Sequence, residues 1–274
     1  MSILKDTKFI MDKYHITANK NLGQNFLIDD DTVSGIVDAA NVSKDDLIIE
    51  IGPGAGALTK ELVKKECDVI CFEIDKRLEN ILNKLESDNN NLKVIFEDFL
   101  KVNIKTYIDT KKYDKLYFVG NLPYYITTAI INKIIKESTP YEIVIMVQKE
   151  VAERFNATPG SREYGSLSVF LQYNFKIEKV CDVNKKCFEP IPKVDSTVIK
   201  FKTTSKYKEK VKNEDKFYKI IKDSFTHKRK NLRNNLMNYD LSKIEEILKK
   251  YNKDLTSRAE SLTIEEFIEI SNNL

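Results

Sequence analysis

Apolar residues in the first half of the chain fall into two alternating patterns. Short, nearly continuous apolar runs predict buried strands at 47–51, 69–74, 92–96, 116–119 and 143–147. Between these runs, apolar residues recur at helical spacing and predict helices at 30–41, 58–65, 78–85 and 126–136. The alternation predicts an α/β fold with a parallel, Rossmann-like sheet and helices on both faces.

The pattern changes near residue 204. A Thr203-Thr204-Ser205 stretch followed by a lysine-rich run favours a linker. After it, apolar residues recur at helical spacing over 217–225, 244–251 and 264–268, without a strong strand signal. We therefore predict two domains, one at 1–204 and a small all-helical one at 205–274, with residues 1–28 as an N-terminal arm.

A glycine-rich turn, EIGPGAG at 50–56, follows the first predicted strand and precedes a helix. Glycines let the backbone turn sharply and approach a ligand without a Cβ clash, so Gly52 and Gly54 are candidate ligand contacts. Glu73 ends the next strand, 21 residues after Gly52, where a carboxylate can accept both ribose hydroxyls of an adenosine. Ala57 occupies the last glycine position of the nicotinamide pattern, so the spacing favours a methyltransferase loop that cradles methionine. A tight turn without a ligand is the alternative.

Asp98 follows the third predicted strand. Strand ends in such a sheet line up along one edge, where ligands bind. A carboxylate at this edge can accept a hydrogen bond from an adenine amine. Taken alone, Asp98 is also compatible with a helix cap or a loop acid.

The segment Asn121-Leu122-Pro123-Tyr124 follows the fourth predicted strand. The adenine amine is a poor nucleophile because its lone pair is delocalised into the ring. Two acceptors, the Asn121 side-chain oxygen and a carbonyl that we assign to Leu122, would hold both N–H bonds and aim the lone pair at a methyl group. Pro123 biases Leu122 towards an extended conformation, and Tyr124 can stack on the base. Found alone, the motif is also compatible with a turn at a strand end.

Charge and cysteine usage narrow the function classes. Residues 200–233 hold 13 Lys and Arg against four acids, although the net charge of the chain is only +3. This surplus favours a polyanionic partner, nucleic acid first, and a solvated lysine-rich surface is an equal alternative. Four cysteines without a CxxC pair and only two histidines argue against a metal site, a disulfide framework and His-dependent nucleophilic catalysis. No apolar segment suits a membrane span or a signal peptide, so we expect a cytoplasmic protein.

Longer motifs, taken together, resemble one family. They are LGQNFL at 22–27, IGPGAGALT at 51–59, NLPYYITT at 121–128, VQKEVAERF at 147–155, YGSLSV at 164–169, FEPIPKVDSTV at 188–198 and KRKNLRNNL at 228–236. Over nearly its whole length the chain resembles the ribosomal RNA adenine dimethyltransferases, of the small-subunit type. The resemblance implies the class I S-adenosylmethionine-dependent methyltransferase fold. Ala129 departs from the proline that the family often carries there, but it touches no proposed chemical role.

The resemblance also implies roles for single residues. Asn25 and Leu27 contact the cofactor, as do the residues at 52, 73, 98 and 121. Phe188 stacks on the target adenine opposite Tyr124, although a core aromatic before a Pro-x-Pro turn is plausible for it too. Basic residues grip RNA phosphates, and each taken singly is also compatible with a solvated face: Lys228, Arg229, Lys230 and Arg233, with help from Lys5, Lys8, Lys13 and Lys20.

The implied activity is two methylations on each of two adjacent adenosines near the 3′ end of 16S rRNA, carried out by a monomer on an immature 30S subunit. The target base must be splayed out, because its amine is inaccessible in a stacked helix. Three alternatives stay open. They are a large-subunit rRNA methyltransferase, a binding factor that checks ribosome assembly, and a nicotinamide oxidoreductase, for which we find no hydride-handling site.

Overall fold

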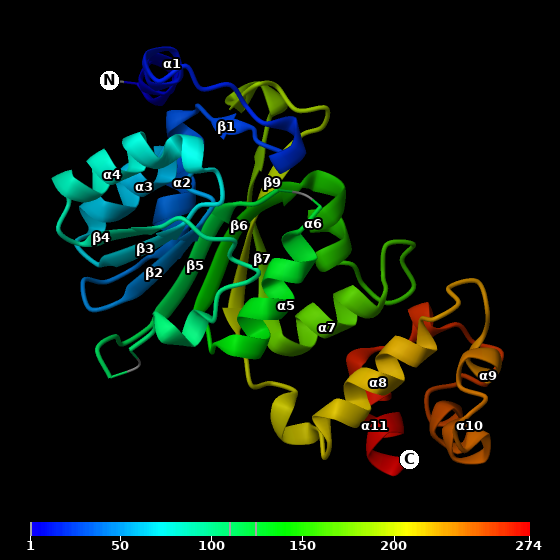
Figure 1. Ribbon diagram of the computed structural model, residues 1–274. Helices are drawn as coiled ribbons and strands as arrows, with labels where there is room; N and C mark the ends of the chain where they lie inside the picture. The colour runs from blue at the N-terminus through cyan, green and yellow to red at the C-terminus, as the bar shows by residue number, and fades with distance from the viewer. Residues whose placement is uncertain (1, 110, 124) are drawn as a thin grey trace. The chain divides into compact units, whose positions relative to one another are not determined.

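The computed structural model describes residues 2–109, 111–123 and 125–274 (Figure 1). The backbone contacts divide the chain into two compact units, residues 1–152 with 178–202, and residues 153–177 with 203–274. This grouping differs from the expected division at residue 204, because residues 153–177 belong to the second unit. Their buried side chains Tyr164, Val169 and Tyr173 share one hydrophobic cluster with Phe217 of the C-terminal helices.

Seven strands among the described residues form one sheet in the order β4-β3-β2-β5-β6-β9-β7. They are β2 (Leu47–Ile51), β3 (Asp68–Phe72), β4 (Leu92–Ile95), β5 (Leu116–Asn121), β6 (Glu142–Gln148), β7 (Phe175–Val183) and β9 (Ser196–Thr203). β2 to β6 run parallel, which confirms the predicted parallel sheet. β9 pairs antiparallel with β6, and neither β9 nor β7 was predicted.

The strand order reverses beside β2. The chain moves outward from β2 to β3 and β4, and then returns to place β5 on the other side of β2. Because strand–helix–strand crossovers are right-handed, α3 (Ala57–Leu62) and α4 (Glu79–Asp88) cover one face of the sheet, and α5 (Thr127–Glu137) covers the opposite face (Figure 1). Such a reversal opens a crevice at the carboxyl ends of the strands, here after Ile51 and Asn121.

Smaller elements complete the first unit. α1 (Ile3–Lys13), β1 (Phe26–Leu27) and α2 (Asp30–Ala40) precede β2, and β8 (Phe188–Glu189) lies between β7 and β9. β1 pairs antiparallel with β8, which fixes the N-terminal segment. The Asp29 carboxylate accepts from the Thr32 backbone N–H and begins α2. Short 3-10 turns occupy Lys20–Leu22, Val63–Lys65, Lys76–Leu78, Ile104–Thr106 and Lys185–Cys187.

Helices make up the second unit. α6 (Lys149–Phe155) leads into it, and α7 (Ser166–Asn174), α8 (Glu214–Ser224), α9 (Leu232–Asn235), α10 (Leu241–Lys249) and α11 (Ile264–Asn273) follow, with 3-10 turns at Lys208–Lys210 and Ala259–Ser261. The three helices expected after residue 204 are confirmed as α8, α10 and α11. A capping box between Thr263 and Glu266 begins α11. In the part of the chain that the structure describes, no helix is long and apolar enough to cross a membrane.

Candidate functional site

A cavity opens at the carboxyl ends of the parallel strands in the first unit. Five segments line it: 22–27 of the N-terminal arm, the turn after β2, the residues after β3 and β4, and the end of β5 with the loop that follows. The cavity brings together all seven residues expected at the cofactor: Asn25, Leu27, Gly52, Gly54, Glu73, Asp98 and Asn121. Leu122 and Pro123 also line it, whereas Tyr124 lies outside the described residues.

The turn after β2 presents its backbone to the cavity. Gly52 and Gly54 have φ angles of 71° and 57°, in the left-handed region that favours glycine. A Cβ atom built on Gly52 meets no protein atom within 4 Å, so the space beside its backbone belongs to the cavity. A Cβ on Gly54 would lie 3.2 Å from the Phe26 ring of the arm. A cradle of this form fits the methionine part of S-adenosylmethionine.

Glu73 lies at the end of β3 with only 4% of its surface exposed. Its two carboxylate oxygens accept from the backbone N–H groups of Gly54, at 3.0 Å, and Asp75, at 2.9 Å. A carboxylate has about four acceptor positions, so these two bonds leave capacity for ribose hydroxyls. Burial raises the pKa of Glu73 above its ordinary value.

Glu50 links the strand before the glycine turn to two neighbouring elements. Its carboxylate is buried at the end of β2 and accepts from the Thr59 hydroxyl at 2.7 Å and the Cys71 thiol at 3.3 Å. Burial raises the pKa of Glu50 to about 7. These two bonds join β2 to α3 and β3. The sequence marked Glu50 only as the start of a motif and gave no role to Thr59 or Cys71.

Asp98 caps a turn and also lines the cavity. Its carboxylate accepts from the Leu100 backbone N–H at 3.0 Å and so caps a turn after β4. The same side chain lines the cavity and is 28% exposed, so it is accessible to a ligand. A Lys101 ammonium lies 3.8 Å away.

Asn121 ends β5, directly beside β2. Its side-chain nitrogen donates to the Asn25 carbonyl at 3.0 Å, which fixes the orientation of the amide group. Gly120 precedes it where β5 closely approaches the end of β2, because a Cβ there would lie 2.7 Å from the Ile51 carbonyl oxygen. The Pro123 carbonyl accepts from the Ile126 N–H and the Thr127 hydroxyl, both at 3.2 Å, and so joins the motif to the start of α5.

Phe188 lies in the hydrophobic core, with 0% of its surface exposed. It sits on β8 opposite Leu27 and packs in the cluster that includes Val183 and Val198. In this position its ring presents no face to a base. The structure therefore places Phe188 as the core aromatic that we named as the alternative to base stacking.

The four main predicted RNA-binding residues lie in the second unit, whereas the supporting Lys5, Lys8 and Lys13 are exposed on α1 in the first unit. Lys228, Arg229 and Lys230 are exposed in the loop between α8 and α9, and Arg233 is exposed in the first turn of α9. The Asn235 side chain orders this basic loop, because it donates to the Ser224 carbonyl at 2.7 Å and accepts from the His227 N–H at 3.2 Å. The sequence offered no local signal for this role of Asn235.

The four cysteine thiols are free, with Cys67 and Cys71 buried and Cys181 and Cys187 half-buried. Burial is the largest cause that raises the pKa of each thiol, which keeps all four protonated near neutral pH. Within the described ranges, no three His, Cys, Asp or Glu side chains gather as metal ligands.

Comparison with known proteins agrees with this geometry. A family model for ribosomal RNA adenine dimethylase matches residues 15–274. The Ribosomal RNA small subunit methyltransferase A of Clostridium botulinum (strain Loch Maree / Type A3) is 42% identical over 269 residues, 97% of each chain. The Clostridioides difficile (strain 630) protein of the same name is 45% identical over 273 residues, 97% of this chain and 94% of its own.

Two solved structures share the fold. A dimethyladenosine transferase from Plasmodium falciparum superposes with a TM-score of 0.75 at 27% identity, over 89% of this chain and 95% of its own. The 23S rRNA methyltransferase ErmE superposes with a TM-score of 0.71 at 26% identity, over 91% of this chain and 99% of its own. The sheet is therefore that of the class I S-adenosylmethionine-dependent methyltransferases, which implies S-adenosylmethionine as the methyl donor.

Proposed function

Because this chain belongs to the ribosomal RNA adenine dimethylase family and is therefore a methyltransferase, we propose that it dimethylates the N6 amines of two adjacent adenosines in the 3′-terminal hairpin loop of 16S rRNA. The observation that carries the proposal is the cavity at the strand-order reversal. There the glycine turn, the Glu73 and Asp98 side chains and Asn121 surround one space.

The donor, S-adenosylmethionine, would supply an electrophilic methyl group on its sulfonium. Gly52 and Gly54 would offer backbone to its methionine part, because neither residue has a Cβ atom that could block the approach of a ligand. The Glu73 carboxylate would accept its ribose hydroxyls, and Asp98 its adenine amine. Asn25 and Leu27 would close the site from the arm. These roles need no metal.

Asn121 would act on the target base. Its nitrogen is engaged by the Asn25 carbonyl, so its oxygen is the atom that would accept from the adenine N6 amine. The Leu122 carbonyl would accept the second N–H and Tyr124 would stack on the base, as predicted from the motif. Positioning of this kind accounts for most of the acceleration, since the product amine can lose its proton to water after methyl transfer.

The basic loop at 225–231 would bind RNA phosphates through Lys228, Arg229 and Lys230, with Arg233 on α9 beside it. The target base would be splayed out of its loop to reach Asn121. We further propose that the protein acts as a monomer in the cytoplasm, on immature 30S subunits, with a role in small-subunit biogenesis. The chain is 42–45% identical to small-subunit enzymes and 26% identical to a 23S rRNA methyltransferase. This difference supports small-subunit rRNA as the substrate over large-subunit rRNA.

Tritiated methyl transfer to immature 30S subunits and to free 23S RNA tests the proposal. We expect label in 16S rRNA and none in 23S RNA; label in 23S RNA alone would contradict the substrate. Asn121→Ala should lower transfer at least about 100-fold, since it removes an acceptor that orients the reacting amine. Asn273→Ala, which changes an exposed asparagine on α11, is the matched control and should keep wild-type transfer.

A further inference from the structure

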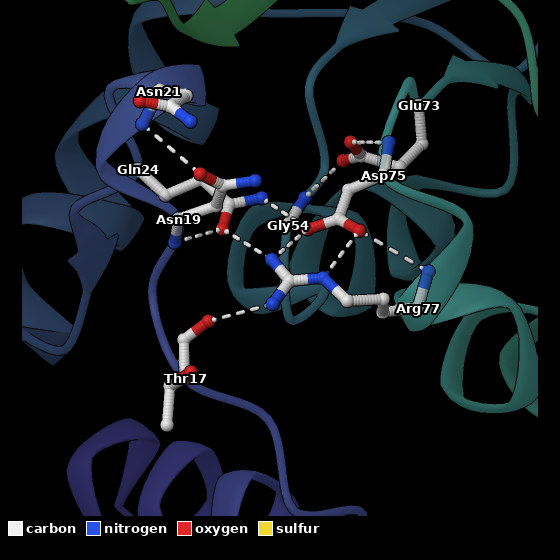
Figure 2. Close-up of polar contacts among 8 residues, drawn as sticks. All are labelled: Thr17, Asn19, Asn21, Gln24, Gly54, Glu73, Asp75 and Arg77. Carbon is white, nitrogen blue, oxygen red and sulfur yellow. Dashed lines mark hydrogen bonds and ion pairs between the residues drawn. The ribbon is translucent and has the colours of Figure 1, made fainter.

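A polar network joins the N-terminal arm to the residues after β3 (Figure 2). The Asp75 carboxylate accepts from the Arg77 guanidinium twice, at 2.8 and 2.5 Å, and from the Gln24 side-chain nitrogen at 2.8 Å. The Gln24 side-chain oxygen accepts from the Asn19 backbone N–H at 2.8 Å, and Arg77 donates to the Thr17 carbonyl at 3.2 Å. Side chains at 75 and 77 thus hold the arm at 17 and 24, and Gln24 in turn holds the backbone at 19.

The same network reaches the candidate cofactor site. The Asp75 backbone N–H donates to the Glu73 carboxylate, the proposed ribose acceptor, whose other oxygen accepts from Gly54 (Figure 2). On the arm side, Gln24 and Asn25 line the cavity, and the Asn25 carbonyl accepts from Asn121. One set of hydrogen bonds therefore runs from the arm backbone to an oxygen of Glu73.

We propose that Asp75 and Arg77 are positioning residues that hold arm residues 17–25 against the cofactor site, so that cofactor binding and ordering of this arm stabilise each other. Neither side chain lines the cavity. A ligand that contacts Asn25 and Glu73 together would favour the conformation in which all hydrogen bonds of the network are formed. By thermodynamic linkage, a fully formed network would in turn raise the affinity for the ligand. This inference rests on S-adenosylmethionine as the cofactor.

The burial of Asp75 explains why the network is strong. Its side chain is 5% exposed, and a buried carboxylate is costly unless it is paired and hydrogen-bonded. The Arg77 guanidinium holds the pKa of Asp75 below its ordinary value, so the carboxylate stays charged at neutral pH. Arg77 itself is 45% exposed, which makes it the member that can be replaced with the smallest change to the core.

The test uses the full chain with Arg77→Gln, and Gln24→Ala as a second variant that leaves the ion pair intact. We expect S-adenosylhomocysteine to bind each variant about tenfold more weakly by calorimetry, because its binding must then order an arm that the network no longer holds. At saturating S-adenosylmethionine, the kcat of Arg77→Gln should stay within about twofold of wild type, because Arg77 does not line the cavity. Cofactor should slow hydrogen exchange at the Asn19 and Gln24 amides in wild type and much less in Arg77→Gln.

Asp68→Asn is the matched control. Asp68 begins β3, the strand that Asp75 follows, and accepts from the Lys112 ammonium at 2.6 Å and the Tyr113 hydroxyl at 2.8 Å. Loss of that surface pair should leave cofactor affinity and arm exchange unchanged. Wild-type affinity and cofactor-dependent exchange in both Arg77→Gln and Gln24→Ala would overturn the inference but not the proposed function. Failure of the wild-type protein itself to bind S-adenosylhomocysteine would overturn the cofactor, and the inference with it.

Discussion

Gly120→Ala should displace the end of β5 and reduce both stability and activity. An alanine Cβ at this position would lie 2.7 Å from the Ile51 carbonyl oxygen and 3.1 Å from a methyl group of Leu122. The oxygen belongs to the backbone of β2, so it cannot rotate away as a flexible side chain would. Restoring an ordinary contact requires a shift of about 0.5–1 Å between β2 and β5.

The expected magnitudes follow from that shift. Overpacking of this kind lowers the free energy of unfolding by about 1–3 kcal/mol. The displaced residue directly precedes Asn121, and a misplacement of about 1 Å at reacting groups costs up to about 100-fold in rate. We therefore expect urea unfolding, followed by circular dichroism, to show the loss of stability. Methyl transfer under conditions where the variant is folded should show a lower kcat.

Gly35→Ala is the control, because Gly35 lies within α2 and a Cβ there meets no atom within 4 Å. It should leave activity unchanged and raise the free energy of unfolding by about 0.5–1 kcal/mol, as alanine replaces glycine in a helix. A Gly120→Ala protein as stable and as active as wild type would refute the reasoning, since the close approach of β2 and β5 would then not constrain Asn121.

Three further predictions concern charge, cofactor and RNA. Burial raises the pKa of Glu50 from 4.5 to about 7, so its stabilising contribution is complete below about pH 4.5 and is lost as pH rises through 7. The free energy of unfolding of Glu50→Gln should therefore rise relative to that of wild type as pH increases from 5 to 8, by up to about 3 kcal/mol in urea unfolding. A constant difference between the two proteins across that pH range would contradict this prediction. Asp98→Asn should weaken S-adenosylmethionine binding by about tenfold in calorimetry, and unchanged affinity would exclude Asp98 from the adenine contact. Asn235→Ala should weaken rRNA binding by releasing the basic loop, while Asn273→Ala should not. If wild type and Asn235→Ala bound rRNA equally well at several salt concentrations, the loop would not need the Asn235 side chain.

The sequence predicted β2 to β6, whose residues are mostly apolar, and missed β7 and β9, in which polar residues recur along the strand. β2 consists of five buried residues, which gives the continuous apolar run that marks a central strand. β7 is an edge strand with mostly exposed or half-buried residues, and β9 begins with buried Ser196 and Thr197. α1 buries only Thr7 and Ile10 and therefore lacks a clear apolar stripe. Predictions from apolar pattern fail where polar residues occupy buried or edge positions.

Some residues of the candidate site could be predicted from the sequence, and others could not. The glycine turn and Glu73 could be predicted because a parallel sheet places successive strand ends at one edge. The contacts of Gln24 with Asp75 and Arg77 join residues 51 and 53 positions apart, and no local spacing encodes such pairings. Phe188 left two interpretations open because an aromatic residue before prolines suits a core as well as a binding site, and only its burial distinguishes them.

The most direct test of the proposed function is the identity and position of the modified nucleosides. Unmethylated 30S subunits would be incubated with the protein and S-adenosylmethionine, and the 16S rRNA would be digested and analysed by mass spectrometry. We predict N6,N6-dimethyladenosine at two adjacent positions in the 3′-terminal hairpin fragment. Methylation at another atom, or in another rRNA segment with this hairpin unmodified, would contradict the assignment of the cavity as an adenine N6 site for small-subunit rRNA.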